Sequence, residues 1–304
     1  MPEPWSTTTT AILRGAGSWG ICLAIAYLLI HSGMILLASR RPQSSVRILL
    51  TNLLLIACFV ILLLGASPDW QEAAGLRFLR LWAPMIFFWW AYKWAGHTLH
   101  LFYPSEFSLD PLLIRLENRW LGQPSLWWAR NGSPWLTELL HGFYVSYYLY
   151  TPALGAYLYT QGRFREFEAM VFAVMLGYAL GYSLSALIPV WGPRWGLVAA
   201  GLLESSEQKL QGYWVTRFID AIMYGGIAHK GAAMPSMHSS TAVVFLFWCS
   251  RLWGFEGGLL AGIVVVGMGV GSVYGRYHYV ADVVCGAAVG ALSVWIADRL
   301  ILGY

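Results

Sequence analysis

Long apolar stretches separated by short polar segments recur along almost the whole chain. Several approach or exceed the roughly 18 residues that a helix needs to cross the hydrocarbon of a membrane. The helices predicted from them lie at about 17–38, 48–66, 78–97, 136–160, 167–189, 238–254, 257–275 and 279–299. We therefore expect an all-α fold, a polytopic membrane helix bundle of about eight transmembrane helices.

Two segments break this pattern. Segment 98–135 mixes charged residues with apolar residues at amphipathic spacing, which is typical of helices that lie in the membrane interface. We expect an interfacial helix pair there. The longest polar interval follows at 190–237, between the fifth predicted helix and the last three.

The last three predicted helices follow one another closely, so the number of crossings decides which residues share a membrane face. Two spans separate the region of His238 from that of His278, which returns the chain to the same side. The span at 167–189 ends at that face as well. Three segments should therefore meet there: 188–195 (IPVWGPRW), 234–240 (MPSMHSS) and 274–282 (YGRYHYVAD).

The composition agrees with a membrane protein. Of the 304 residues, 58% are hydrophobic and 11% are charged, whereas soluble domains carry roughly 25% charged residues. The 17 tryptophans and 17 tyrosines fit aromatic belts at the level of the lipid headgroups. The net charge of +4 suits anionic headgroups and gives no reason to expect a nucleic-acid partner. We expect an integral protein of the plasma (cell) membrane.

His278 and Asp282 are four residues apart, which on a helix places them on one face, one turn apart. A carboxylate there can hold a proton on one imidazole nitrogen and leave the other nitrogen free for nucleophilic attack. Ionisable residues near a membrane interior are costly and tend to mark function. The alternative is a buried ion pair that only fixes helix packing.

The stretch MPSMHSS opens one of the apolar runs with residues suited to a helix start. Pro235 fits the first turn, and the unpaired amides there can be satisfied by Ser236, Ser239 and Ser240. Exposed amides at a helix N-terminus also attract phosphate, and His238 would stand beside that anion. Ordinary capping is the alternative, but capping needs no histidine.

Arg194 supplies a guanidinium in the stretch WGPRW. Such a group binds phosphate oxygens in a bidentate manner better than lysine does. Alternatively, the arginine and the flanking Trp191 and Trp195 would form an anchor at the membrane interface. Its expected place beside the two histidine segments favours phosphate binding.

Together these residues resemble the signatures of the type 2 phosphatidic acid phosphatase superfamily: Lys-x6-Arg-Pro, Pro-Ser-x-His and Ser-Arg-x5-His-x3-Asp. The second signature is intact at 235–238, and the third keeps His278 and Asp282. The resemblance runs from about residue 98 to the end, and ENRWLGQPSLWW looks like the branch that includes inositol phosphorylceramide synthase. It implies a six-helix phosphatase-like catalytic membrane domain at 76–304 and two extra N-terminal helices within 1–75.

The chain departs from the superfamily at cationic positions. Leu187 stands where the first signature has lysine, and in WGPRW the proline precedes the arginine. Gly271 and Ser272 replace the Ser-Arg of the third signature. Because a pentavalent phosphoryl transition state must be neutralised, we expect Arg276 and Lys230 to supply charge from other backbone positions. Lys230 also fits an ordinary solvated loop.

The resemblance implies a metal-independent reaction in two displacements. His278, oriented by Asp282, attacks phosphorus to form a phosphohistidine while His238 protonates the leaving alkoxide. Ser236 and Arg194 hold the phosphoryl oxygens, and water or an alcohol then takes the phosphoryl group with His238 as base. We expect no cofactor and no metal, a lipid phosphate as substrate, and an acceptor alcohol such as inositol if the group is transferred.

The sequence allows alternatives on three points. Hydrolysis or transfer depends on access of water, and an enclosed pocket lined by the aromatic residues of 140–160 and 191–195 would favour transfer. A lipid transporter or flipping protein with a phosphatase-like fold is the alternative to an enzyme, and it predicts charges along a path at mid-membrane depth. The side of the membrane that carries the site is the third point. Eight spans place loop 39–47 (SRRPQSSVR) on the same face as the site, and its basic residues predict the cytoplasmic side. The resemblance implies the exoplasmic side, where members of the superfamily mostly act.

Overall fold

The computed structural model describes residues 17–65, 73–205, 209–224 and 229–303. Helices make up most of this part of the chain, which confirms the predicted all-α class for the described residues. In chain order they are α2 (Ser18–Leu37), α3 (Ser45–Leu64), α4 (Ala74–Ala95), α5 (Asp110–Trp120), α6 (Pro124–Asn131), α7 (Pro134–Thr160), α8 (Phe164–Leu187), α9 (Pro193–Ala199), α10 (Trp214–Tyr224), α11 (Met237–Tyr274), α12 (Val280–Ala297) and a π-helical turn, η1 (Asp298–Leu302).

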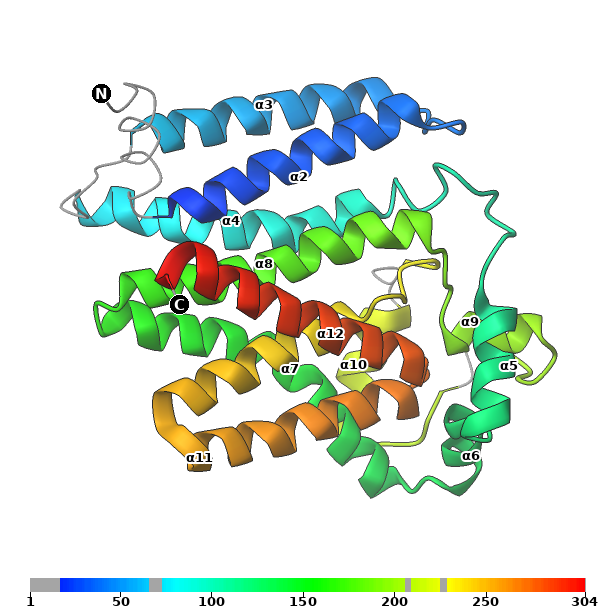
Figure 1. Cartoon of the computed structure of the whole chain (residues 1–304). Helices are drawn as coiled ribbons and strands as arrows, with labels where there is room; N and C mark the ends of the chain where they lie inside the picture. Colours follow the sequence, from blue (N-terminus) through cyan, green and yellow to red (C-terminus); the bar gives the residue numbers. More distant parts are fainter. Residues whose placement is uncertain (1–16, 66–72, 206–208, 225–228, 304) are drawn as a thin grey trace.

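The long helices run alongside one another as a bundle (Figure 1). Five segments of the described chain are long and apolar enough to cross a membrane: α2, α3, α8, α11, and α12 continued by η1. The chain is therefore an integral membrane protein by helix length and composition. Helices α4 and α7 coincide with two further predicted spans, but they are not among the helices that are both long and apolar enough. The count of eight spans stays a prediction.

Helix α11 consists of two arms that meet at a sharp turn. Trp253 and Gly254 have non-helical backbone angles, with φ 63° at Gly254, a left-handed conformation that glycine adopts without steric cost. The chain turns back on itself there, as Figure 1 shows. This turn confirms the prediction of two separate helices at 238–254 and 257–275.

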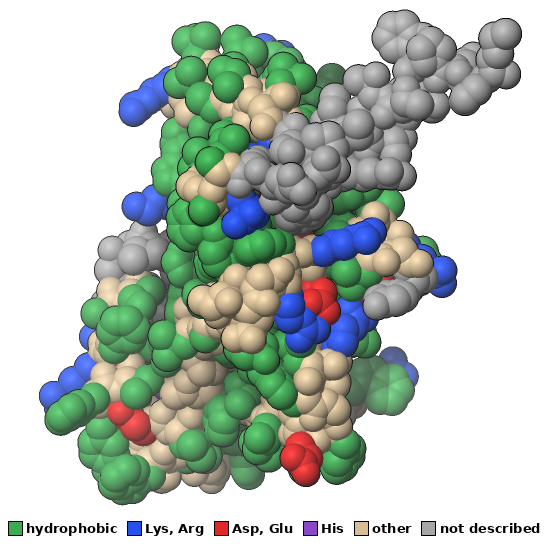
Figure 2. Space-filling view, turned by 90° about the vertical axis from the view of Figure 1, so that its left-hand side faces the viewer, with side chains coloured by type: hydrophobic (Ala, Val, Ile, Leu, Met, Phe, Trp, Pro, Cys, Tyr) green, Lys and Arg blue, Asp and Glu red, His purple; other side chains and the backbone are tan. Residues whose placement is uncertain are grey.

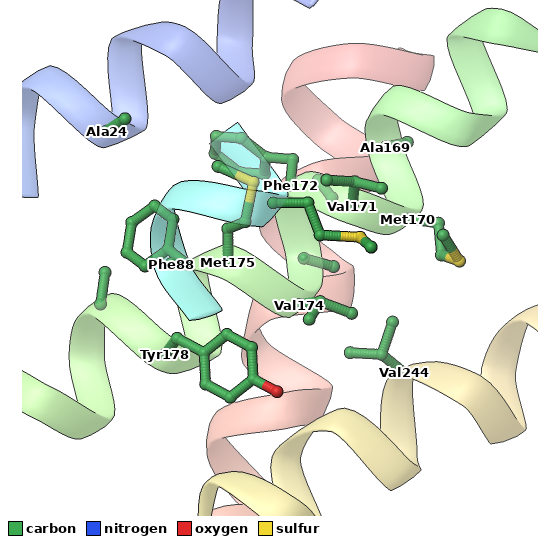
Figure 3. Close-up of a cluster of buried hydrophobic side chains, with 14 of the residues drawn as sticks. Ala24, Phe88, Ala169, Met170, Val171, Phe172, Val174, Met175, Tyr178 and Val244 are labelled. Atoms are coloured by element: carbon green, nitrogen blue, oxygen red, sulfur yellow. The ribbon is translucent and has the colours of Figure 1, made fainter. Parts of the chain in front are cut away.

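Helix α8 lies in the core of the bundle, and 16 of its 24 residues are buried. Figure 3 shows its side chains, including Phe172 and Met175, among residues of other helices such as Ala24 of α2, Phe88 of α4 and Val244 of α11. A helix that is apolar on every side suits such a central position. Because α2 contributes to the same core, the N-terminal helices pack directly on the rest of the chain. The domain division at residues 75 and 76 stays a prediction.

Two glycines let α12 pack closely against the start of α11. A Cβ atom at Gly286 would lie 2.1 Å from the carbonyl oxygen of Ser236, and one at Gly290 would lie 2.4 Å from that of Ser240. Small residues four apart commonly permit such close contact between helices in membranes. The approach brings the N-terminal ends of α11 and α12 together, and Ser236 N donates a hydrogen bond to the carbonyl oxygen of Asp282 at 3.0 Å.

The short helices α5, α6 and α9 lie together at one end of the bundle (Figure 1). Helices α5 and α6 are the pair predicted within 98–135, whereas α9 and α10 lie in the polar interval 190–237, where the hydrophobic pattern predicts no span. The loop between α2 and α3 is tied to the chain that leads into α5, because Ser39 Oγ and Arg40 N both donate to the carbonyl oxygen of Leu101.

The opposite end of the bundle carries charged side chains as well. Figure 2 looks at that end and shows Lys, Arg, Asp and Glu side chains among hydrophobic ones. Near the turn of α11, Arg251 pairs with Asp298 of η1 through two hydrogen bonds of 2.8 and 2.5 Å. Charged side chains at an end of the bundle, beyond the long apolar helices, fit a bundle that spans a membrane.

Candidate active site

Three distant segments meet where α11 and α12 begin. Backbone hydrogen bonds join them, since Ala233 N donates to Val190 O at 3.1 Å and Arg194 N donates to Arg276 O at 3.1 Å. The hydrogen bond between the backbones of Ser236 and Asp282 adds a third link. The predicted convergence of the three segments is confirmed.

His278 is buried, and two oxygen atoms lie on the Nδ1 side of its ring, one of them within hydrogen-bond distance. Nδ1 lies 2.9 Å from the carbonyl oxygen of Ala233, and because a carbonyl can only accept, we assign the ring proton to Nδ1. The lone pair is then on Nε2. Asp282 Oδ2 lies 3.7 Å from Nδ1, which is too long for a hydrogen bond but close enough to stabilise positive charge on the ring. The same oxygen accepts from Tyr279 N at 2.8 Å, which fixes the carboxylate in the first turn of α12.

His238 lies next to His278 and completes a histidine pair. Its Nδ1 is 3.4 Å from His278 Nε2, although the two residues are 40 positions apart. On the other side, His238 Nε2 lies 3.1 Å from the hydroxyl of Tyr144, and the ring of Tyr147 packs against it at a centroid distance of 4.5 Å. The structure thus brings together the two histidines that the sequence singled out.

Ser236 is fully buried and caps α11. Its Oγ accepts a hydrogen bond from Ser239 N at 3.3 Å, an interaction that typically stabilises a helix by about 1 kcal/mol. This is the capping role that the sequence predicts for Ser236, whereas the hydroxyls of Ser239 and Ser240, predicted to share it, have no hydrogen-bond partner among the described residues. Binding of a phosphoryl oxygen by Ser236 stays a prediction.

The three candidate cations occupy different places around the site. Arg194 and Arg276 both line the cavity next to the histidines. Arg276 is buried, and its backbone is in the left-handed region, with φ 63°. Lys230 is exposed, and its ammonium lies 3.6 Å from the ring centroid of Trp191, itself a lining residue. The two arginines therefore lie at the same cavity as the histidines, and Lys230 lies beside the cavity wall.

A cavity of about 300 Å³ opens onto the histidine pair, a volume at the lower end of those that hold small ligands. Its walls are mainly aromatic. They are formed by Trp89, Tyr92, Lys93, Tyr144, Tyr147, Tyr148, Tyr178, Tyr182, Trp191, Arg194, Trp195, Ile222, His229, Ala232, Ala233, Met237, His238, Arg276, Tyr277 and His278. Aromatic residues of 140–160 and 191–195, which the sequence allows as a pocket lining or as a membrane belt, therefore contribute to the lining.

Two contributors to the site are not recognisable from the sequence. The carbonyl oxygen of Ala233 fixes the His278 ring, but a backbone group leaves no residue signature. Tyr144 contacts His238, yet its position in a run of tyrosines fits a membrane belt equally well. Only the three-dimensional contacts separate these roles.

Glu117 of α5 lies behind the start of α12 and is buried. Its Oε1 accepts from Val280 N at 2.6 Å, while its Oε2 has no hydrogen-bond partner among the described residues. Burial raises the pKa of Glu117 to about 7, the negative charge of Asp282 adds to the rise, and the hydrogen bond from Val280 opposes it. The folded protein therefore favours the protonated carboxyl.

Replacing Glu117 by glutamine is expected to change how stability depends on pH. Since the folded pKa of about 7 lies above the ordinary 4.5, wild-type stability should fall as pH rises from 4.5 through 7, relative to the variant. The amide still accepts from Val280 N and cannot ionise. A difference on the order of 2 kcal/mol is expected by pH 8, measured by thermal unfolding in detergent. Glu106→Gln, at an exposed site, is the control, and parallel pH curves would contradict the assignment.

Comparison with protein families agrees with this geometry. The family model described as PAP2 superfamily matches residues 111–296, a region that holds both histidines, Asp282, Arg194 and Arg276. Searches of curated proteins and of solved structures give no significant match. Membership of this superfamily indicates a phosphatase-type enzyme with a lipid phosphate as its fitting substrate. Because the matched region covers more than half of the chain, the protein belongs to the PAP2 superfamily.

Proposed function

We propose that the protein is a lipid phosphate phosphatase or phosphotransferase that works through a phosphohistidine on His278. The observation that carries the proposal is the pair of imidazoles, with His278 Nε2 and His238 Nδ1 separated by 3.4 Å, at a cavity that Arg194 and Arg276 also line. A nucleophile, a proton donor and two cations at one cavity are the groups that phosphoryl transfer needs.

In the first step, His278 Nε2 forms a bond to phosphorus as the bond between phosphorus and the lipid oxygen breaks. His238 gives its proton to the departing alkoxide, so no free alkoxide is released. The carbonyl of Ala233 keeps the Nδ1 proton in place, and Asp282 stabilises the positive charge that the phosphorylated ring acquires. Arg194 and Arg276 neutralise the equatorial oxygens, Ser236 donates a hydrogen bond to one of them, and Lys230 adds positive charge from beside the cavity wall.

In the second step, the oxygen of water or of an alcohol forms a bond to phosphorus and the bond to His278 breaks. His238, now neutral, takes the proton of the attacking hydroxyl, which restores both histidines to their starting states. The aromatic lining of the cavity supports transfer to an alcohol, because tyrosine and tryptophan walls exclude bulk water and stack against the apolar face of a cyclic polyol such as inositol.

We propose the plasma membrane as the location of the protein.

The proposal is tested by incubating purified protein in detergent with a panel of lipid phosphates and diphosphates, with and without inositol and other alcohols. Release of inorganic phosphate identifies a hydrolase, and product that forms only with an alcohol identifies a transferase. Neither activity, together with movement of lipid between leaflets of reconstituted vesicles, would instead identify a flipping protein.

A further inference from the structure

Asp110 is a buried carboxylate at the first residue of α5, behind the candidate active site. Its Oδ2 accepts from Trp191 N at 2.7 Å and from Ser108 Oγ at 2.8 Å. Its Oδ1 accepts from Gly192 N at 3.0 Å and from the hydroxyl of Tyr279 at 2.9 Å. Burial raises the pKa of Asp110, and these four hydrogen bonds counter the rise.

Three of the four donors connect Asp110 to two of the three segments that build the site. Trp191 and Gly192 immediately precede the turn that carries Arg194, and Tyr279 immediately follows His278 and caps α12. One carboxylate therefore holds both the loop of the phosphate-binding arginine and the residue next to the expected nucleophile.

The packing around this carboxylate is too close for the loop to shift freely. A Cβ atom at Gly196 would lie 2.1 Å from Asp110 Oδ1 and 2.4 Å from the Tyr279 hydroxyl. Gly192 has φ 92°, and a Cβ atom there would lie 3.0 Å from the carbonyl oxygen of Tyr277. The loop is thus fixed from α5 on one side and from the chain before His278 on the other.

We propose that Asp110 is a positioning residue for phosphoryl transfer, which holds the 191–194 loop so that Arg194 faces the phosphoryl group at the histidine pair. This inference rests on the proposed function. Its physical basis is that a charged group stabilises a transition state only when it is held in place before the reaction. The carboxylate oxygens are occupied by their four donors, so Asp110 acts through the loop and not on the substrate.

A double-mutant cycle in the full-length protein separates positioning from general support of the fold. Asp110→Asn places an amide N–H₂ opposite donors, so at least one hydrogen bond is lost and the loop moves. We expect the turnover number to fall about 10- to 100-fold with a smaller change in KM. In the Arg194→Ala background, Asp110→Asn should lower the turnover number less than about threefold, because the guanidinium that Asp110 positions is absent.

Additive losses in the cycle, or an Asp110→Asn variant with wild-type turnover, would overturn the proposal. Glu106→Gln removes an exposed carboxylate from the same segment and should leave turnover unchanged. If Asp110→Asn does not fold, Gly192→Ala tests the same loop. That variant strains the loop from its other side and should show the same loss and the same dependence on Arg194.

Binding of vanadate, a phosphate analogue, distinguishes failure of this inference from failure of the proposed function. Trp191 and Trp195 line the cavity, so their fluorescence reports vanadate binding without any turnover. We expect about 10-fold weaker binding in Asp110→Asn and no further weakening when Arg194→Ala is added. If wild-type protein binds vanadate in this pattern but turns over no lipid, the proposed function is wrong and the positioning role stands. Unchanged affinity in Asp110→Asn would remove the positioning role.

Discussion

Replacement of His278 by alanine is expected to abolish turnover, with a loss on the order of 10⁴-fold or more. The other nitrogen of this ring, Nδ1, lies against the carbonyl oxygen of Ala233, which can only accept a hydrogen bond. Nδ1 therefore carries the proton, and Nε2 carries the lone pair that attacks phosphorus. Without it, no nucleophile is prepared for attack on phosphorus. The measurement is release of phosphate or transfer product from the best substrate of the panel, together with rapid acid-free quenching to detect phosphohistidine.

The control for this variant is His97→Ala, which removes an exposed histidine outside the cavity lining. It should keep wild-type turnover and the phosphorylated intermediate. Should His278→Ala retain a substantial part of the activity, water would be attacking phosphorus directly and the covalent mechanism would be wrong. Retained activity without a trapped intermediate would point to the same conclusion.

The hydrophobic pattern predicted the long helices because membrane burial imposes a length and a composition that few other structures share. The predicted 167–189 and the observed Phe164–Leu187 differ by two or three residues at each end. The turn inside α11 was also predictable, since Gly254 interrupts an apolar run at the depth where a span must end. Helices α9 and α10 were not, because short helices outside the membrane need no continuous apolar stretch.

The histidine pair was predictable by connectivity, since two crossings return the chain to one face whatever the helix packing. The supporting carboxylates were not. Asp110 and Glu117 lie seven residues apart in a segment whose charges fit the membrane interface, and nothing local shows that both are buried. Their burial depends on loops more than 70 residues away, which donate to Asp110, and on the start of α12, which donates to Glu117.

For the cations that replace those of the superfamily signatures, the sequence shows which residues are charged but not where their side chains lie. Charge alone singled out Arg276 and Lys230. Arg276 lines the cavity because its left-handed backbone, φ 63°, accompanies the tight turn before His278, which the sequence pattern does not reveal. Lys230 lies over the ring of Trp191, a residue of the cavity wall, and its part in binding phosphate stays a prediction.

Replacement of His238 by alanine is expected to have an effect that depends on the leaving group. With a lipid phosphate, whose alkoxide needs a proton, the loss should be about 10²- to 10⁴-fold, the usual contribution of a general acid. With nitrophenyl phosphate the leaving phenolate needs no proton, so the first step should survive. The variant then lacks the base for the second step, and phosphohistidine should accumulate on His278.

The measurement for His238 is therefore a burst experiment in a stopped-flow instrument. The variant should release close to one equivalent of nitrophenolate per site, followed by slow turnover, whereas wild-type protein shows continuous release. Adding an acceptor alcohol should not restore the second step, because the attacking hydroxyl loses its base whichever acceptor is present. Equal losses in both steps and with both substrates would show that His238 holds the site together without moving a proton, since only proton transfer distinguishes an alkoxide from a phenolate.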